Sequence, residues 1–300
     1  MKKHIILLSA AGLLFSSCGV YTKYKPATEV PDGLYGEEMA AFTESLAGSP
    51  AATEDSLDLG LGGMDWHELF TDPHLQALIG QGLQNNTDYQ SAQLRVEEAE
   101  ATLLSAKLAF APQGTVSSFD SRKATQTYSL PVTASWELDV FGRMRNAKKQ
   151  SKALYAQSQD YRQAVRTQLI AGIANTYYTL LMLDQQLAIS RQTEETWWET
   201  VASTRALMNA GMANESAVSQ MEATYYQVQT SVLDLEEQIN QVENSLALLL
   251  AETPRHYERG VLAEQQFPVG FSIGIPVQML SCRPDVRSAE RTLEAAFYGT

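Results

Sequence analysis

The stretch from Asn214 to Ala251 reads NESAVSQMEATYYQVQTSVLDLEEQINQVENSLALLLA and holds the most regular pattern in the chain. Its apolar residues recur at alternating steps of four and three, which is the spacing of a coiled-coil seam. Asn214 can cap the start of a helix here, and Glu252-Thr253-Pro254 can end it. The seam comprises Met221, Tyr225, Val228, Val232, Leu235, Ile239, Val242, Leu246 and Leu249. The stretch therefore predicts a helix that packs lengthwise against a second helix.

The second helix is expected just before this stretch, from Arg143 to Asn209. That segment contains no proline and a single glycine, Gly172, and a helix of this length extends roughly 100 Å. Its apolar stripe comprises Val165, Leu169, Ile173, Tyr177, Leu180, Leu183, Leu187, Trp197 and Val201. The tetrapeptide Ala210-Gly211-Met212-Ala213 then interrupts the helical pattern. We therefore predict a coiled-coil hairpin that bends back at Gly211.

Before the long arm, the pattern changes to a period of two residues. Apolar and polar side chains alternate from Thr127 to Leu138 and more weakly from Thr115 to Ser121. This predicts two strands, residues 113–121 and 127–138, joined as a β-hairpin. Pro131 must then occupy a bulge or an irregular position, because proline cannot donate to a ladder. The apolar face could belong to a protein core or meet lipid, and the pattern alone does not choose between them.

A further helix is expected before the strands, from Pro73 to Ala111. Asp72 is its candidate N-cap and Pro73 its first residue. This helix and the returning arm together roughly match the long arm in length, so the two shorter helices could stack end to end along it.

The start of this helix is echoed near the end of the chain. At a constant offset of 197, five residues match Asp88, Ser91, Ala92, Glu97 and Ala99, namely Asp285, Ser288, Ala289, Glu294 and Ala296. A second copy of the unit thus begins where the first has finished. We expect the native protein to continue beyond Thr300 and complete it.

The N-terminus carries an export signal. Lys2 and Lys3 precede an apolar run that is too short to span a bilayer, and Ser16-Ser17 precede Cys18. Small residues before a cysteine are typical of a bacterial lipobox, so we predict cleavage after residue 17 and acylation of Cys18. An ordinary signal peptide with a chance cysteine is the alternative. The following residues, up to about Met64, lack periodicity and predict an extended tether.

Composition limits the partners and the redox chemistry. The loss of residues 1–17 leaves 20 basic and 35 acidic residues, a net charge of −15, which makes nucleic acid a poor partner. Cys282 is the only other cysteine. With Cys18 acylated, the chain has no internal disulfide, and Cys282 is expected to be a small buried apolar residue.

Candidate catalytic groups are weak. His67, His74 and His256 lack the spacing of metal ligands. Glu137 and Asp139 share one face of a strand and could mimic a catalytic carboxylate pair, but a polar cluster at a strand end explains them more simply. Arg283, Pro284 and Asp285 indicate the entrance of a helix. The sequence predicts no enzyme, no cofactor and no metal site.

Three motifs resemble a known family. They are Trp66-His-Glu-Leu-Phe-Thr-Asp-Pro-His-Leu, Ser135-Trp-Glu-Leu-Asp-Val-Phe-Gly-Arg143 and Cys282-Arg-Pro-Asp-Val-Arg-Ser-Ala-Glu290. Over residues 66–300 the chain resembles the TolC/OprM/NodT-like outer-membrane efflux factors, specifically their lipoprotein branch. The structural motif residues are Trp136, Glu137, Asp139, Phe141, Gly142, Arg283, Pro284 and Asp285.

The resemblance implies a mixed fold of all-α coiled coil plus transmembrane β-barrel. Three chains would form a homotrimer that shares one barrel in the outer membrane, above a periplasmic tunnel of long helical hairpins. It implies a passive efflux duct for small molecules, lipid-anchored and surrounded by outer-membrane lipid. Its expected partners are a periplasmic adaptor (membrane fusion) protein and an inner-membrane efflux pump.

The resemblance also implies where the partners meet. The turn at residues 207–216 would be the periplasmic tip that contacts the adaptor, although Glu215 could simply be an exposed acid at a helix start. The expected tip residues are Ala210, Gly211, Met212, Asn214 and Glu215. In the family the acidic constriction lies in the second hairpin, so gate residues are expected beyond residue 300.

These expectations divide the chain into seven segments. They are a lipoprotein signal peptide (1–17), a lipidated tether (18–64), a first periplasmic helix (65–112), an outer-membrane strand pair (113–141), a coiled-coil hairpin (142–251), a connecting segment (252–281) and an incomplete second repeat (282–300). Two other functions stay open on sequence alone. A lipid-anchored periplasmic adaptor also uses a coiled-coil hairpin, though inside a lipoyl-like β domain, and a surface-binding lipoprotein would need no heptads.

Overall fold

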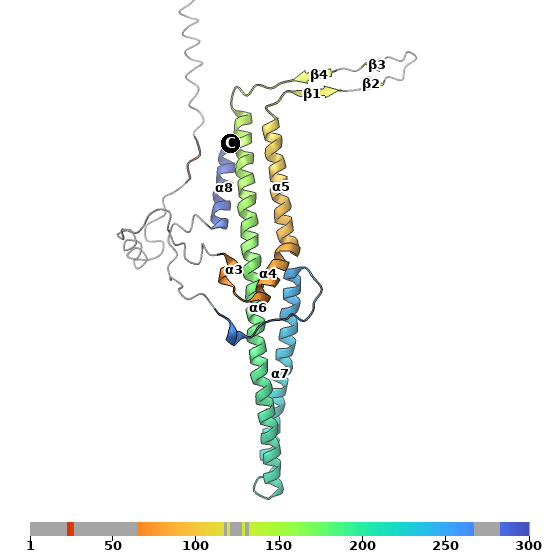
Figure 1. Cartoon of the computed structure of the whole chain (residues 1–300), viewed down its shortest axis with the longest axis vertical. Helices are drawn as coiled ribbons and strands as arrows, with labels where there is room; N and C mark the ends of the chain where they lie inside the picture. The colour runs from red at the N-terminus through yellow and green to blue at the C-terminus, as the bar shows by residue number, and fades with distance from the viewer. Residues whose placement is uncertain are drawn as a thin grey trace, which may run out of the picture. The chain divides into compact units, whose positions relative to one another are not determined.

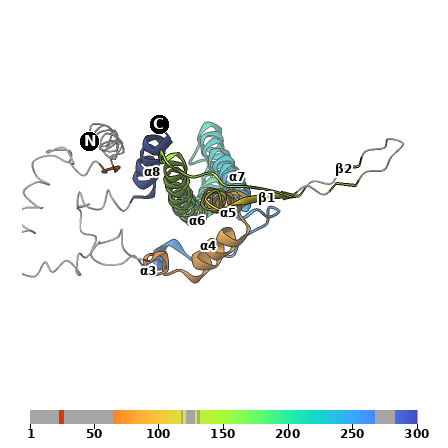
Figure 2. The same ribbon diagram turned by 90° about the horizontal axis from the view of Figure 1, so that it is seen from above.

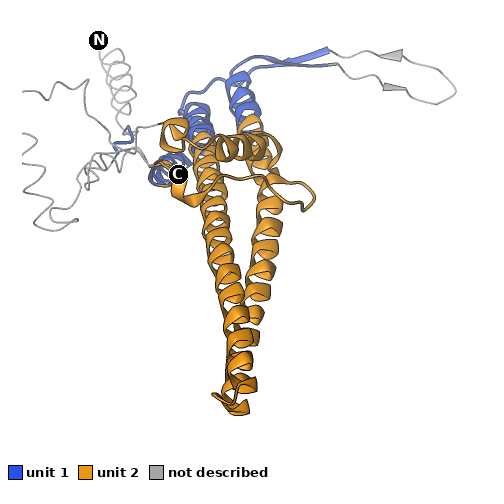
Figure 3. Ribbon diagram, turned by 60° about the horizontal axis from the view of Figure 1, so that its bottom comes forward, with its two compact units in different colours: residues 1–44, 99–157, 286–300 blue, residues 45–98, 158–285 orange. Residues whose placement is uncertain are grey.

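A computed structural model of the chain describes residues 23–26, 65–116, 119–120, 128–129, 132–266 and 283–299. Contacts divide the chain into two compact units (Figure 3). Unit 1 comprises residues 1–44, 99–157 and 286–300, and unit 2 comprises residues 45–98 and 158–285. The elements (Figure 1) are α3 (Trp66–Leu69), α4 (Pro73–Asn85), α5 (Thr87–Leu108), β1 (Gln113–Val116), β2 (Phe119–Asp120), β3 (Tyr128–Ser129), β4 (Val132–Ser135), α6 (Arg143–Asn209), α7 (Glu215–Leu250), the 3₁₀ turn η3 (Leu262–Glu264) and α8 (Pro284–Gly299).

The long helices α6 and α7 form the predicted hairpin. In unit 2 they lie side by side (Figures 1 and 3), and each predicted seam residue of α7 is buried or half-buried. Asn214 caps α7, since its side chain accepts a hydrogen bond from the Ala217 N–H at 2.9 Å. The predicted bounds of α6 are confirmed, because nothing in that segment breaks a helix.

The core of unit 2 lies where α4 packs against α6 and α7. Leu75 and Ile79 of α4, Ile173 of α6, and Leu246 and Leu250 of α7 are all 0% exposed. Each such burial stabilises the fold by about 1.5–3 kcal/mol relative to an exposed side chain. This region therefore anchors the midpoint of α6.

The predicted first helix is not continuous, and this corrects the expectation of one helix from Pro73 to Ala111. The chain breaks at Asn86, whose backbone is extended (φ −61°, ψ 126°). The Asn86 side chain accepts a hydrogen bond from the Tyr89 N–H at 2.9 Å and so caps α5. Its amide also donates to the Leu249 carbonyl at 3.0 Å. Asn86 thus joins the start of α5 to the end of α7, which is the end-to-end joint expected from the helix lengths.

In unit 1 the strands pair as one antiparallel hairpin. Gln113 faces Ser135 and Val116 faces Val132 in the β1–β4 ladder, and Phe119 faces Ser129 in the β2–β3 ladder, which keeps the same register. Every residue of β4 is exposed, so β4 contributes no face to a core. Pro131 lies outside the described residues.

The second predicted strand extends too far. β4 ends at Ser135, and Trp136 to Asp139 leave the ladder. The reason is a set of competing bonds: the Trp136 indole N–H donates to the Phe110 carbonyl at 3.1 Å, and the Asp139 carboxylate accepts from the Arg145 N–H at 2.9 Å. The residues after Ser135 serve the start of α6 instead of the sheet.

Helix α8 packs beside α6 within unit 1 (Figures 1 and 2). The Gln157 side chain donates to the Thr292 hydroxyl at 3.0 Å, and the Lys149 ammonium lies 5.0 Å from the Tyr298 ring centre. At the offset of 197, the first residue of α8 corresponds to Thr87, the first residue of α5. The repeat inferred from the five sequence identities therefore also applies to the positions at which α5 and α8 begin.

None of the described helices combines the length and the apolar character needed to cross a membrane.

Candidate functional sites: the helical tip and the strand–helix junction

The tip that joins α6 to α7 is a tight and exposed turn. Gly211 has a positive φ of 74°, its N–H donates to the Met208 carbonyl at 2.9 Å, and the Met212 N–H donates to the Leu207 carbonyl at 2.9 Å. These two bonds form a Schellman motif, which satisfies the last carbonyls of α6. Met212 is 72% exposed and Leu207 is 45% exposed, so the tip presents apolar side chains to solvent.

The predicted tip residues come together at this turn. Ala210, Gly211, Met212, Asn214 and Glu215 all lie within residues 210–215, and all five are exposed. Glu215 lies in the first turn of α7, where a carboxylate is favourable to the helix dipole. A few residues from the turn, Arg205 of α6 and Glu222 of α7 form an ion pair that links the two arms.

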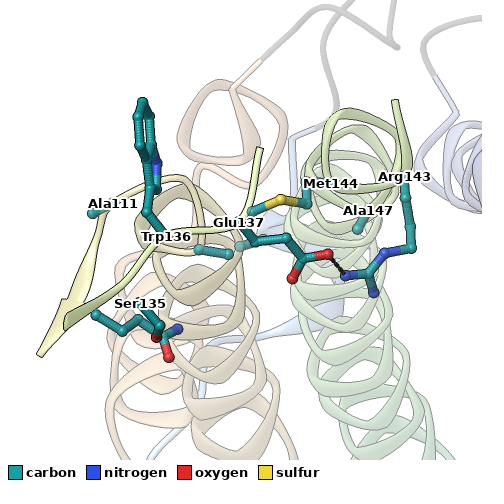
Figure 4. Close-up of a pocket in the computed structure, with 10 residues that line it drawn as sticks. Ala111, Ser135, Trp136, Glu137, Arg143, Met144 and Ala147 are labelled. Carbon is teal, nitrogen blue, oxygen red and sulfur yellow. Dashed lines mark hydrogen bonds and ion pairs between the residues drawn. The ribbon is translucent and has the colours of Figure 1, made fainter. Parts of the chain in front are cut away.

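The strand–helix junction is built by the second family motif (Figure 4). Gly142 has a positive φ of 78° and makes the turn into α6. Asp139 accepts hydrogen bonds from the Met144 N–H at 3.2 Å and the Arg145 N–H at 2.9 Å, and so caps the helix. Burial alone would raise the pKa of Asp139, but these donors and the Arg145 side chain outweigh it and hold the pKa below its usual range.

Glu137 has a different partner from Asp139. Its carboxylate accepts from the Arg143 guanidinium at 2.6 Å (Figure 4), and this pair raises the pKa of Arg143. Both side chains are exposed, so solvent screens the pair and it contributes little to stability. Because the two carboxylates serve separate structural roles, the strand end does not form a catalytic pair.

A pocket of about 450 Å³ lies at this junction. Its walls come from α5, the strand ends and the first turns of α6, and include Ala106, Gln113, Trp136, Glu137, Arg143 and Ala147. The motif residue Phe141 is 81% exposed and Val140 is 74% exposed. The junction therefore combines exposed apolar side chains with an ion pair.

The third motif opens α8, as predicted. Pro284 is the first residue of α8, and Asp285 lies in its first turn. The Arg283 guanidinium donates to Asp285 at 2.6 and 3.1 Å. Cys18 lies outside the described residues, and its acylation stays a prediction. The described ranges contain no group of three or more His, Cys, Asp or Glu side chains arranged to hold a metal ion.

Sequence reasoning missed a buried polar cluster in unit 2. The Arg259 guanidinium is 7% exposed and binds Asp184 of α6 at 2.5 and 2.9 Å and Glu243 of α7 at 2.5 Å. The network holds residues 252–266 against both arms. Removing Arg259 would leave Asp184 without this partner and the buried Glu243 with His256 as its remaining ion-pair partner. No local spacing signals it, because Arg259 lies 75 residues from Asp184.

A second part of this cluster fixes the start of α4. Asp72 caps α4 by accepting from the His74 N–H at 2.8 Å. Its other oxygen accepts from the Tyr177 hydroxyl at 2.5 Å and the Gln265 amide at 2.8 Å. Tyr177 also accepts from the Gly260 N–H at 3.0 Å. Burial and the bond to Asp72 raise the pKa of Tyr177.

The basic residues after Gly142 were also missed. Arg143, Arg145, Lys148, Lys149 and Lys152 are all exposed, and no acidic residue occurs from Arg143 to Gln159. A count of charge along the helix would have revealed them.

Comparisons with known proteins agree with this architecture. Residues 78–252 match the family model described as outer membrane efflux protein. The chain is 30% identical over 241 residues to the probable outer membrane lipoprotein SilC of Salmonella typhimurium, covering 77% of this chain and 52% of SilC. It is 26% identical over 301 residues to the cation efflux system protein CusC of Escherichia coli K12, covering 97% of this chain and 63% of CusC. The chain thus spans between half and two thirds of the length of these relatives.

Solved structures share the fold. A crystal structure of CusC superposes with a TM-score of 0.68 at 26% identity, covering 79% of this chain and 57% of that one. The open state of the Neisseria gonorrhoeae MtrE outer membrane channel superposes with a TM-score of 0.69 at 26% identity, covering 80% and 55%. The predicted outer-membrane location is confirmed by these relatives. Since the matched residues include the whole helical hairpin and the joint at Asn86, the chain belongs to the outer membrane efflux protein family.

Proposed function

We propose that this chain forms part of the outer-membrane channel of a tripartite efflux system. The channel is a passive trimeric duct through which small molecules pass from an inner-membrane pump to the exterior. The observation that supports this most is the order of parts along the chain: a strand hairpin, the helix α6 and an exposed tight turn. The family match favours this function over a periplasmic adaptor.

The strand hairpin is the part we assign to the membrane. All four residues of β4 are exposed, and Val132 is 70% exposed. A two-stranded hairpin leaves backbone N–H and C=O groups unpaired along its edges, and lipid cannot form hydrogen bonds with them. A closed barrel pairs every strand. Three chains that each add strands to one barrel solve this problem, and the exposed Phe141 and Trp136 would lie near its lipid boundary.

The tip is the part we assign to the adaptor. Leu207 and Met212 are exposed at the Schellman turn, where an adaptor could bury their apolar surface. The neighbouring Asn214 and Glu215 add polar contacts around them. In this proposal the duct has no energy source of its own, and opening is a change in the packing of the helical arms.

The names of the relatives do not narrow the substrate to one class. CusC is named for cation efflux, ArpC of Pseudomonas putida for antibiotic efflux, and TtgC of Pseudomonas putida for toluene efflux. These substrates share little chemistry, so we assign small toxic molecules as a group.

The lipid anchor is a separate part of the proposal. Cys18 is expected to carry the acyl chains, as in the relative named as a lipoprotein. The intact mass of protein purified from outer membranes tests this. A mature chain that begins at Cys18 with added acyl mass supports the anchor, and cleavage without added mass contradicts it.

Transport is tested in a host from which the gene has been deleted. We expect the deletion strain to accumulate more of at least one compound from a panel of an antibiotic, a metal cation and toluene. The full-length protein should restore the parental level. The double variant Leu207→Asp/Met212→Asp should not restore it, because charge at the tip removes the apolar contact.

The matched control is Ser219→Asp, an exposed position on α7 near the tip, which should restore transport. Native mass measurement of each variant should give a trimer in equal amounts. Unchanged accumulation in the deletion strain for the whole panel would overturn the efflux function. A tip variant that transports normally would overturn the adaptor contact alone.

A further inference from the structure

The first turns of α6 carry a basic face. Arg145, Lys148, Lys149 and Lys152 recur at spacings of three, one and three residues, which places them on one side of a helix. All four side chains are exposed. This face belongs to a chain whose net charge is −13, so its positive charge is a local feature.

Only one carboxylate of the described residues pairs with this face. Arg145 contacts Asp139 at 3.3 Å. Within the described residues, Lys148, Lys149 and Lys152 form no ion pair. The Lys148 ammonium lies 5.8 Å from the Phe110 ring centre and that of Lys149 lies 5.0 Å from the Tyr298 ring centre. Aromatic rings position an ammonium without neutralising it, so three positive charges stay available for an anion.

The described N-terminal residues 23–26 lie beside α8, next to this face. The Tyr24 ring packs against Phe297 of α8 at 5.8 Å between centres, and Phe297 precedes Tyr298, which contacts Lys149. Cys18 is six residues from Tyr24, so the chain between them spans at most about 21 Å. Lys23 and Lys25 flank Tyr24 and are exposed, although Glu290 and Glu294 of α8 lie near Tyr24 and offset part of their charge.

We propose that the face formed by Arg145, Lys148, Lys149 and Lys152 binds the anionic phospholipid headgroups of the periplasmic leaflet of the outer membrane. This inference rests on the proposed function, which places the strand hairpin in the outer membrane. The face directly follows the strand hairpin and its exposed Val140 and Phe141, and basic clusters next to a membrane-embedded segment bind anionic lipid. A lysine ammonium suits a phosphate because it is a compact point charge with three donors.

The role of such a contact is to fix the position of α6 relative to the membrane surface. Acyl chains on Cys18 hold the N-terminus in the membrane but allow rotation and tilt. A second, electrostatic contact on a rigid helix would restrict both. It would also strengthen the attachment, because stable anchoring takes two signals, such as an acyl chain and a basic patch.

The test uses the intact lipidated protein, purified in an uncharged detergent and titrated with fluorescent phosphatidylglycerol or phosphatidylcholine in mixed micelles. We expect phosphatidylglycerol to bind at least tenfold more tightly at low salt. The variant Lys148→Gln/Lys149→Gln/Lys152→Gln should lose this preference by roughly 10- to 100-fold. Because these lysines are exposed and lack ion pairs, the variant should keep the helical circular dichroism of the parent.

Two controls separate the face from overall charge. Lys148→Arg/Lys149→Arg/Lys152→Arg should retain the preference. Arg191→Gln/Arg205→Gln/Arg255→Gln removes the same charge from unit 2 and should also retain it. Equal affinity for the two lipids, or a preference that survives the glutamine substitutions, would overturn the inference. Since micelle binding requires no transport, these results are independent of the efflux assay.

Discussion

Two glycines of α4 are expected to respond in opposite ways to one added methyl group. A Cβ at Gly82 would lie 2.4 Å from the Ile173 Cδ1, whereas a Cβ at Gly80 would meet nothing within 4 Å. Gly82→Ala should destabilise the fold by about 1–3 kcal/mol through overpacking. Gly80→Ala should stabilise it by about 0.5–1 kcal/mol, because alanine favours the helix.

Thermal unfolding followed by helical circular dichroism checks this pair of glycines. In a chain of this size each kcal/mol shifts Tm by roughly 2–4 °C. Gly80→Ala serves as the control for the general effect of alanine in α4. Equal shifts for both variants would contradict the close contact between α4 and α6.

Asp72 at the start of α4 makes stability depend on pH. Burial raises the pKa of this carboxyl, but the bonds from Tyr177, Gln265 and the His74 N–H outweigh it and lower the pKa below 3.8. The ionised form therefore stabilises the fold above about pH 4, and this contribution is lost as the pH falls through the lowered pKa. Asp72→Asn keeps the cap but cannot accept all of these bonds, and should cost about 1–3 kcal/mol at pH 7.

The difference in Tm between this variant and the parent should narrow as the pH falls from 7 through the lowered pKa of Asp72, because Asp72 of the parent is then protonated as well. Asp65→Asn is the matched control, because Asp65 also caps a short helix but is exposed. A constant difference at all pH values would show that the charge of Asp72 contributes nothing.

At the scale of single residues, local sequence patterns predicted the features that depend on residues close in sequence, such as helix caps. Asp72 before Pro73 predicted a cap, and the structure confirms it. The break at Asn86 was missed because apolar periodicity continues through it, and only the amide contact to Leu249 explains it. The partners of Arg259 could not be predicted, since their contact depends on how the 252–266 segment crosses both arms.

At the scale of elements, the ends of the two hairpin helices offer a matched test. Gly211 after α6 and Ala251 after α7 both adopt positive φ, 74° and 52°, and both donate Schellman-type bonds. The left-handed conformation costs a residue with a Cβ about 1–2 kcal/mol. Gly211→Ala should therefore lower stability by about that amount, and Ala251→Gly should raise it by a similar or smaller amount.

Chemical unfolding of both variants in the same detergent measures the two effects. Hydrogen exchange of residues 205–220 should rise in Gly211→Ala and stay unchanged in Ala251→Gly. If Ala251→Gly lowered stability, the left-handed end of α7 would be refuted.

Periodicity predicted the helices best. The heptads of α7 and the unbroken pattern of α6 predicted two helices packed lengthwise, because an apolar stripe of that length is buried along another helix. The strand pair was placed correctly but too long. Trp136 leaves the ladder to donate to the Phe110 carbonyl after α5, and Asp139 accepts from the first turn of α6. Hydrogen bonds from side chain to backbone leave no periodic trace.

At the scale of the whole molecule, apolar side chains on α5 stay uncovered in the single chain. Leu94 is 63%, Leu104 is 53% and Leu108 is 59% exposed. The sequence pattern of α5 does not say what covers these leucines. A stripe of exposed leucines favours a protein interface, and in the proposed trimer a neighbouring chain would cover it.

Glutamate at two of these positions should therefore weaken assembly without unfolding the chain. We expect Leu104→Glu/Leu108→Glu to shift the native mass from trimer to monomer, because two charges would be buried without partners at the interface. The helical circular dichroism should stay unchanged, since both side chains are exposed in the single chain. Lys107→Glu, on the flank of the same turn, controls for added negative charge and should remain trimeric. A double variant that stays trimeric would place this face of α5 outside the interface.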